Sequence, residues 1–232
     1  MIVALLGALG CRTPAPVSEL ISVQSAAPGG GAAVVVVAVH GLGDVPGSLL
    51  DLVRGCTARV RVVAPRGPIR HGEGFSWFET QFSEEGASAS GADVAAASDR
   101  LAVLIDGIAQ QRNTVGKPIL TGFSQGGMLS FAVAVRHPES IAAAFPLAGA
   151  LPTDLLPTAA PSGGGPPIRA LHGDADPVLP IAPTRALVRQ LDAQGWDATL
   201  RVFAGTEHAV PPAMHAQLCA SISALVTPSP SP

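Results

Sequence analysis

Tyrosine is absent from this 232-residue chain, and aromatic side chains make up only 4% of it. So few rings argue against a platform on which nucleic-acid bases could stack. Charged residues are also scarce, at 13%, and the formal net charge is −3. Without a run of Lys and Arg, the chain lacks the patch that would displace counterions from a phosphate backbone. These shortages exclude nucleic-acid-binding proteins from the expected classes.

Cysteine is nearly absent too, with three residues in the whole chain. No His, Cys or Asp spacing resembles a metal-binding motif, so we expect no metal site. Cys56 and Cys219 flank no further cysteine pattern. They could pair in an exported protein, but we favour two buried small hydrophobic residues.

The amino-terminal segment, residues 1–33, differs from the rest. Residues 1–10 are apolar or glycine, which is too short to span a bilayer but suits the hydrophobic region of a signal peptide. Ala8-Leu-Gly-Cys11 resembles a bacterial lipobox, in which the cysteine is lipidated after cleavage. Two alternatives stay open. Either the protein is exported and attached to a membrane through a lipidated Cys11, or it is cytoplasmic with an apolar terminus.

Apolar residues, by contrast, are abundant at 47%, enough to build the core of one domain of this length. We expect strands at residues 34–39, 60–64, 118–123, 141–147, 168–171 and 199–203, preceded by a weaker edge strand at 19–23. We expect helices at residues 48–56, 92–112, 127–136, 184–194 and 213–226. This alternation predicts an α/β fold over residues 34–226, with a mainly parallel central sheet and helices on both faces.

The remaining segments are expected to be irregular. Residues 65–82 are rich in Gly, Pro and aromatic side chains and predict a loop. Residues 152–167 are rich in Pro, Gly and Ser and predict an exposed excursion. The Pro/Ser tail, residues 227–232, has no apolar face to pack and is expected to be disordered.

Gly122-Phe-Ser-Gln-Gly126 is a Gly-x-Ser-x-Gly pattern between an expected strand and an expected helix. A sharp strand-to-helix turn at Ser124 would leave little space for side chains on either side, which accounts for the two glycines. The helix behind it would direct free N–H groups towards whatever Ser124 attacks. By itself this five-residue pattern is weak evidence for a nucleophile.

Partners for Ser124 follow at the ends of later strands. His172-Gly-Asp-Ala-Asp176 follows one strand, and His208 follows the last one. The order Ser, Asp, His is that of an α/β hydrolase. In a parallel sheet the carboxyl ends of the strands lie along one edge, so these residues are expected to meet there.

Several further segments resemble one known family. They are His40-Gly-Leu-Gly-Asp44, Phe75-Ser-Trp-Phe-Glu79, Leu147-Ala-Gly-Ala-Leu-Pro152 and Gly205-Thr-Glu-His208. Together with the serine motif, they are similar to the phospholipase/carboxylesterase group of the α/β-hydrolase fold. That group includes acyl-protein thioesterases and small bacterial carboxylesterases. Glu79 and Glu207 stand where the group usually has Asp and Gly.

The resemblance implies a role for each matching residue. Ser124 would be the nucleophile, His208 the general base and then acid, and Asp176 the acid that orients His208. Asp174 would hydrogen-bond its turn. The oxyanion hole would consist of the backbone N–H groups of Leu42 and Gln125, and no cofactor would be needed. The residues themselves offer four aromatic candidates for the acyl pocket: Phe75, Trp77, Phe78 and Phe123. For Phe75, Trp77 and Phe78, packing within their own loop is the alternative that stays open.

The predicted function is that of a serine esterase, which hydrolyses small carboxylic esters of short-to-medium acyl chains through an acyl-enzyme. One alternative is the same machinery acting on an acyl thioester or a lysophospholipid. Another, of a different class, is a non-catalytic lipid-anchored binding protein on a hydrolase shell. The sequence carries no indication of oligomeric state.

Overall fold

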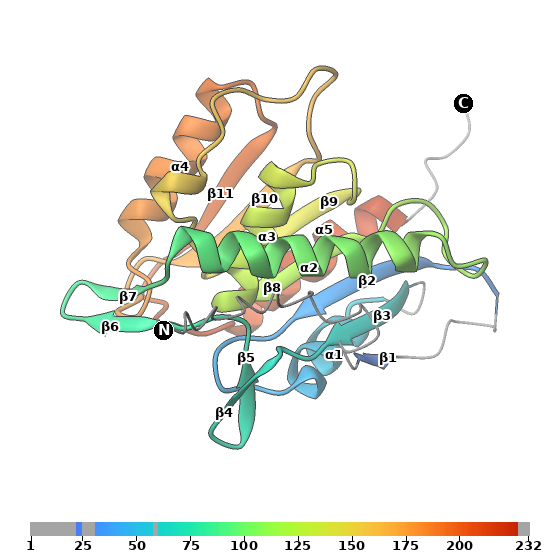
Figure 1. The fold of residues 1–232 in the computed structure, drawn as a ribbon, viewed down its shortest axis with the longest axis horizontal. Coiled ribbons are helices and arrows are strands. Elements are labelled where there is room, and N and C mark those ends of the chain that lie inside the picture. Colours follow the sequence, from blue (N-terminus) through green and yellow to red (C-terminus); the bar gives the residue numbers. More distant parts are fainter. Residues whose placement is uncertain (1–21, 25–30, 58–59, 227–232) are drawn as a thin grey trace, which may run out of the picture.

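A seven-stranded sheet forms the centre of the computed structural model, which describes residues 22–24, 31–57 and 60–226 (Figure 1). Its strands are β1 (Ser22–Gln24), β2 (Val34–Val39), β3 (Val60–Pro65), β8 (Ile119–Phe123), β9 (Ala143–Leu147), β10 (Ile168–Gly173) and β11 (Ala198–Phe203). They lie in the order β1-β3-β2-β8-β9-β10-β11. Only the edge strand β1 runs antiparallel to its neighbour among these described strands. The predicted α/β-hydrolase architecture is confirmed.

Five α-helices accompany the sheet in the described residues: α1 (Pro46–Arg54), α2 (Gly91–Ala109), α3 (Gln125–Arg136), α4 (Ile181–Ala193) and α5 (Pro212–Val226). Local chemistry accounts for several of their ends. The Ser90 side chain caps α2 by accepting a hydrogen bond from Asp93 N, and a proline begins α1, where a missing N–H costs nothing. In Figure 1, α2 crosses the near side of the sheet and α5 lies behind the strands.

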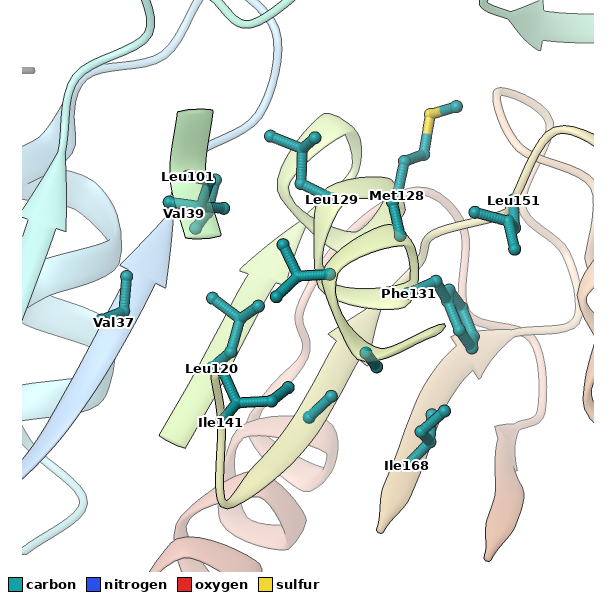
Figure 2. Packing of buried hydrophobic residues seen from close by; sticks show 14 of the residues in the cluster. Val37, Val39, Leu101, Leu120, Met128, Leu129, Phe131, Ile141, Leu151 and Ile168 are labelled. Atoms are coloured by element: carbon teal, nitrogen blue, oxygen red, sulfur yellow. The ribbon is translucent and has the colours of Figure 1, made fainter. Parts of the chain in front are cut away.

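Strand β2 shows why both faces are covered. Val35, Val37 and Val39 pack on one side with residues of α2, α3 and α4, while Val36 and Ala38 pack on the other with α1 and α5. Successive side chains of a strand point to opposite faces, so an all-apolar strand needs a layer on each. Figure 2 shows the first layer, where Val37 and Val39 lie near Leu120 and the side chains of α3.

The chain changes direction across the sheet at β2. From β2 it moves to β3 on one side, and it later returns to place β8 on the other. Crossovers that leave in opposite directions open a crevice at the carboxyl ends of the two strands. The Ser124 turn follows β8 and the His40–Asp44 segment follows β2, so both lie at this switch point.

The prediction of a loop over residues 65–82 is wrong in part. Two short hairpins form there and just beyond: β4 (Ile69–His71) with β5 (Gly74–Ser76), and β6 (Gln81–Ser83) with β7 (Gly86–Ser88). Three-residue strands are too short to produce a recognisable alternation. The excursion at residues 152–167 is irregular as expected, apart from one 3-10 turn, η3 (Thr153–Leu155).

The predictions for the termini fall largely outside the described residues. Cys11 and its lipobox-like segment lie there, as does the tail 227–232, so both stay predictions. Strand β1 belongs to the sheet although it precedes the predicted domain start at residue 34. Within the described part of the chain, no helix combines the length and the apolar character needed to cross a membrane.

Our interpretation of Cys56 and Cys219 as unpaired residues is wrong. The two form a disulfide across 163 residues of sequence, with their Cα atoms 4.5 Å apart. Cys56 follows α1 and Cys219 lies on α5, and these helices pack on the same face of the sheet. The pairing depends on this tertiary packing, and therefore no cysteine spacing in the sequence could reveal it.

Removing the disulfide with the double variant Cys56→Ser/Cys219→Ser is expected to destabilise the fold by about 2–5 kcal/mol, because a long loop is no longer closed in the unfolded chain. The melting temperature, followed by circular dichroism, should fall by roughly 5–15 °C. A thiol reductant should lower the melting temperature of the wild type similarly and leave the variant unchanged. Equal melting temperatures for wild type and variant would contradict a stabilising role.

Candidate active site

Ser124 lies in a strained turn between β8 and α3, with φ 57° and ψ −115°. The two flanking glycines make this turn possible. A Cβ on Gly122 would collide with the carbonyl of Gly126, and one on Gly126 with the carbonyl of Val39. The predicted nucleophile elbow is therefore present in its geometry, and it presents the Ser124 hydroxyl at the end of the sheet.

A chain of hydrogen bonds links Ser124 to His208 and Asp176. Ser124 Oγ lies 2.9 Å from His208 Nε2, and His208 Nδ1 lies 2.7 Å from Asp176 Oδ2. A carboxylate can only accept, so His208 donates from Nδ1 and leaves Nε2 free to accept the serine proton. The three residues come from the ends of β8, β10 and β11, which is where the sequence placed them. This arrangement can activate a hydroxyl for attack on a carbonyl.

Asp176 is held as an ionised carboxylate. Its Oδ1 accepts hydrogen bonds from Val178 N (2.9 Å) and Leu179 N (2.8 Å), and His172 Nε2 lies 3.2 Å from its Oδ2. Burial by itself would raise the pKa of Asp176. Hydrogen bonds from His172, His208 and Leu179 N outweigh this and hold that pKa well below its usual range. The same His172 Nε2 lies 2.8 Å from Leu179 O, so its proton is shared between that carbonyl and the carboxylate, and His172 thus helps to orient the acid.

Asp174, the other candidate acid, is not a member of this chain of hydrogen bonds. It is exposed, and its Oδ1 accepts a hydrogen bond from Gly205 N at 2.6 Å. Asp174 thus hydrogen-bonds the turn that follows β11 and not its own turn, and its structural role stays a prediction.

The two predicted oxyanion donors, Leu42 and Gln125, line the same cavity as Ser124 and His208. Within the described residues, neither backbone N–H donates to a protein acceptor. Free backbone donors beside a nucleophile can stabilise the negative charge that develops on a carbonyl oxygen under attack.

The cavity at Ser124 has a volume of about 360 Å³. It is lined by Gly41, Leu42, Asp44, Thr80, Phe82, Ala87, Ser88, Phe123, Ser124, Gln125, Met128, Val178, Leu179 and His208. The β6–β7 hairpin forms one wall and is tied to the segment around Asp176, because Ala87 N donates to Val178 O at 2.7 Å. Phe123 lies against His208, with 4.7 Å between ring centroids.

Three of the four aromatic residues predicted for the acyl pocket do not line this cavity. Trp77 and Phe78 are each only 2% exposed and belong to the core. Phe75 lies beneath the guanidinium groups of Arg66 and Arg70. Only Phe123 lies where it was expected. The prediction for Phe75, Trp77 and Phe78 is wrong for this cavity, because contacts of their side chains hold the rings elsewhere: the Trp77 indole donates to His40 O, Phe78 packs in the core, and Phe75 contacts the two guanidinium groups.

The wall that the β6–β7 hairpin supplies was not predicted from the sequence. Its available signal was Phe82, a lone aromatic side chain between Gln81 and Ser83, which is 65% exposed. Single exposed apolar side chains are common on protein surfaces, so Phe82 by itself is too weak a signal to have predicted this wall.

One cluster in the described residues brings potential metal ligands within 4.8 Å of one another: Cys56, His215 and Cys219. Its two sulfurs are bonded to each other. They are therefore not available to a metal while the disulfide is intact.

Comparison with known families agrees with this geometry. The sequence pattern of the phospholipase/carboxylesterase family matches residues 22–226. The chain belongs to this family. The resemblance noted from the sequence motifs is thereby confirmed, and the family is one of phospholipases and carboxylesterases.

Individual relatives are distant. NocK of Nocardia uniformis subsp. tsuyamanensis is 42% identical over 61 residues, which make up 26% of this chain and 17% of that protein. The match thus spans well under two thirds of NocK's length. Among solved structures, esterase PE8 has a TM-score of 0.76 at 24% identity, covering 90% of this chain and 99% of its own.

Two further structures share the fold. Zea mays acyl-protein thioesterase 2 has a TM-score of 0.71 at 21% identity, over 89% of this chain and 99% of its own. The Bacillus cereus carboxylesterase has a TM-score of 0.75 at 15% identity, over 89% and 95%. At such identities, these similarities concern the fold alone.

Proposed function

We propose that this protein hydrolyses carboxylic esters of short-to-medium acyl chains through an acyl-enzyme on Ser124. The observation that carries the proposal is the continuous hydrogen-bonded path Ser124–His208–Asp176, which opens onto a cavity with two free backbone N–H groups. Membership of the phospholipase/carboxylesterase family supports the same chemistry.

The reaction follows from the roles that the geometry allows. His208 Nε2 takes the proton of Ser124 as Oγ attacks the ester carbonyl carbon. The resulting oxyanion accepts hydrogen bonds from Leu42 N and Gln125 N. The tetrahedral intermediate collapses as His208 protonates the leaving alcohol, and the acyl group remains on Ser124. Water, deprotonated by His208, then attacks the acyl-enzyme and releases the acid.

The size and lining of the cavity support a small ester. Its volume of about 360 Å³ is near the lower end of the range typical of small-molecule sites. The side chains around Ser124 that are large enough to contact an acyl chain are mostly apolar, including Phe82, Met128, Val178 and Leu179. An aliphatic chain would gain about 0.8 kcal/mol for each methylene that it buries there.

Filling the cavity with Ala87→Phe tests the assignment of the acyl site. The kcat/KM for p-nitrophenyl hexanoate and octanoate is expected to fall about 10–100-fold, because the Phe ring would occupy the space in which several methylenes of the acyl chain are buried. Hydrolysis of the acetate should change less than about threefold. Ala96→Phe is the matched control, since Ala96 lies on the exposed face of α2. Uniform loss across chain lengths would contradict the assignment of the acyl site.

Adding acyl thioesters and lysophospholipids to this panel of esters tests the alternative functions. Acyl thioesters and lysophospholipids present a carbonyl that the same three side chains could attack, and faster turnover of either by the wild type would replace the ester as preferred substrate. A non-catalytic binding protein would turn over none of them. In that case the proposed function would be wrong.

Membrane attachment through a lipidated Cys11 also stays a proposal. It is supported by the disulfide between Cys56 and Cys219, because disulfides persist mainly in proteins outside the reducing cytoplasm. The intact mass of the native protein tests it, and an unmodified Met1 at the amino terminus would contradict it.

A further inference from the structure

The two proposed oxyanion donors come from separate parts of the chain. Leu42 N belongs to the segment after β2, and Gln125 N begins α3. Both must lie within about 3 Å of one oxygen atom to act together. Because 83 residues separate them in sequence, their relative position depends on contacts between the two segments.

The Gln125 side chain provides the first of these contacts. It is 2% exposed, and its carboxamide is bound to the segment 76–80. Oε1 accepts from Trp77 N at 2.9 Å, and Nε2 donates to Phe78 O at 2.9 Å and to Thr80 Oγ1 at 2.8 Å. One residue thus offers its backbone N–H to the cavity and uses its side chain to hold the neighbouring segment.

Trp77 continues the connection to the other donor. Its indole Nε1–H donates to His40 O at 3.0 Å, and its ring lies 5.2 Å from the His40 ring between centroids. His40 stands two residues before Leu42. Trp77 therefore links the two parts of the chain. Its backbone N–H binds the Gln125 side chain, and its indole N–H binds the segment that carries the second oxyanion donor, Leu42 N.

His40 sets the direction of that donor. Its Nε2 accepts from Gly67 N at 3.0 Å, so its Nδ1 carries the proton and donates to Gly41 O at 2.7 Å. Burial lowers the pKa of His40, which favours this neutral form. Gly41 O and Leu42 N belong to one planar trans peptide, in which C=O and N–H point in opposite directions. Holding the carbonyl therefore aims the Leu42 N–H.

We propose that the Gln125 side chain and the Trp77 indole form a brace that fixes the two oxyanion donors relative to each other. Trp77 is thus a positioning residue for transition-state stabilisation and not a wall of the acyl pocket. This inference rests on the proposed ester hydrolysis, and it concerns only how the oxyanion hole is held together. It also explains why a large aromatic ring next to the site is buried away from the cavity.

The variant Trp77→Phe tests the brace, because it removes the indole N–H and keeps an aromatic ring. We expect kcat on p-nitrophenyl butyrate to fall about 10-fold with KM changed less than about twofold, since oxyanion donors act on charge that develops in the transition state. The affinity of a trifluoromethyl ketone, which forms a tetrahedral adduct with serine, should fall by the same factor.

Trp196→Phe is the matched control. Trp196 is 3% exposed, and its Nε1 has no hydrogen-bond partner in the described part of the chain. The same change of volume should therefore leave kcat within about twofold of wild type. Melting temperatures of both variants establish that they fold. If Trp196→Phe lowers kcat as much as Trp77→Phe, general core packing is responsible and the brace is refuted.

A second variant guards against misfolding of the first. Gln125→Met keeps the backbone N–H and the side-chain length but loses the carboxamide bonds, and it should also lower kcat without raising KM. In the double variant the losses should be less than multiplicative, because both residues act through one brace. Fully multiplicative losses, or a raised KM with unchanged kcat, would overturn the proposal. Absence of ester turnover in the wild type would instead refute the proposed function.

Discussion

Replacing Ser124 with Ala is expected to lower kcat/KM for ester hydrolysis on the order of 10⁴–10⁶-fold, because no other group can form the acyl-enzyme. The substitution removes a single oxygen atom at the end of the hydrogen-bonded path from Asp176. Burst kinetics on p-nitrophenyl butyrate would measure the loss, and a fluorophosphonate probe would cease to label the protein, since it reacts only with an activated serine.

Ser98→Ala is the matched control for this experiment. Ser98 is also buried, but its hydroxyl donates to Ala95 O within α2. Activity and labelling should therefore survive in Ser98→Ala. Turnover by Ser124→Ala at more than about a hundredth of the wild-type rate would refute the assignment of the nucleophile.

The second large effect is expected for Asp176→Asn, which should lower kcat by about 10⁴-fold. An Asn at this position can still accept from Val178 N and Leu179 N through its Oδ1. Its NH₂ group would then face His208 Nδ1 and accept no hydrogen bond from it. The imidazole would be left in the tautomer with its proton on Nε2, which cannot take the proton of Ser124.

The matched control is Asp174→Asn, two residues away. Asp174 accepts one hydrogen bond, from Gly205 N, and an Asn oxygen can replace it. We expect the kcat of Asp174→Asn to lie within about threefold of wild type. Single-turnover measurements on both variants separate the two carboxylates, and a greater loss in Asp174→Asn than in Asp176→Asn would exchange their assigned roles.

Much of the fold follows from local patterns. The apolar β-branched run at residues 34–39 coincides with β2, and the predicted helices overlap the observed ones with ends shifted by a few residues. These elements are long and strongly patterned, so local sequence outweighs tertiary effects. The two hairpins between β3 and α2 were missed because strands of three residues carry no periodic signal.

The arrangement of Ser124, Asp176 and His208 could also be predicted, for a topological reason. In a parallel sheet, the carboxyl ends of strands that are distant in sequence lie along one edge. Residues that directly follow different strands are therefore brought close together in space. Motifs at the ends of β8, β10 and β11 therefore converge whatever the lengths of their connections. The same rule places the segment after β2 beside Ser124.

The sequence by itself determined the family, the sheet and the three residues expected to carry the chemistry, because these depend on chain order and local patterning. Only the tertiary structure decided which way side chains of the irregular segments point. Trp77 turns inward to hydrogen-bond His40 O, Phe82 lies at the cavity, and Cys56 meets Cys219. Contacts between residues distant in sequence determine these orientations, so a pattern read along one segment cannot reveal them.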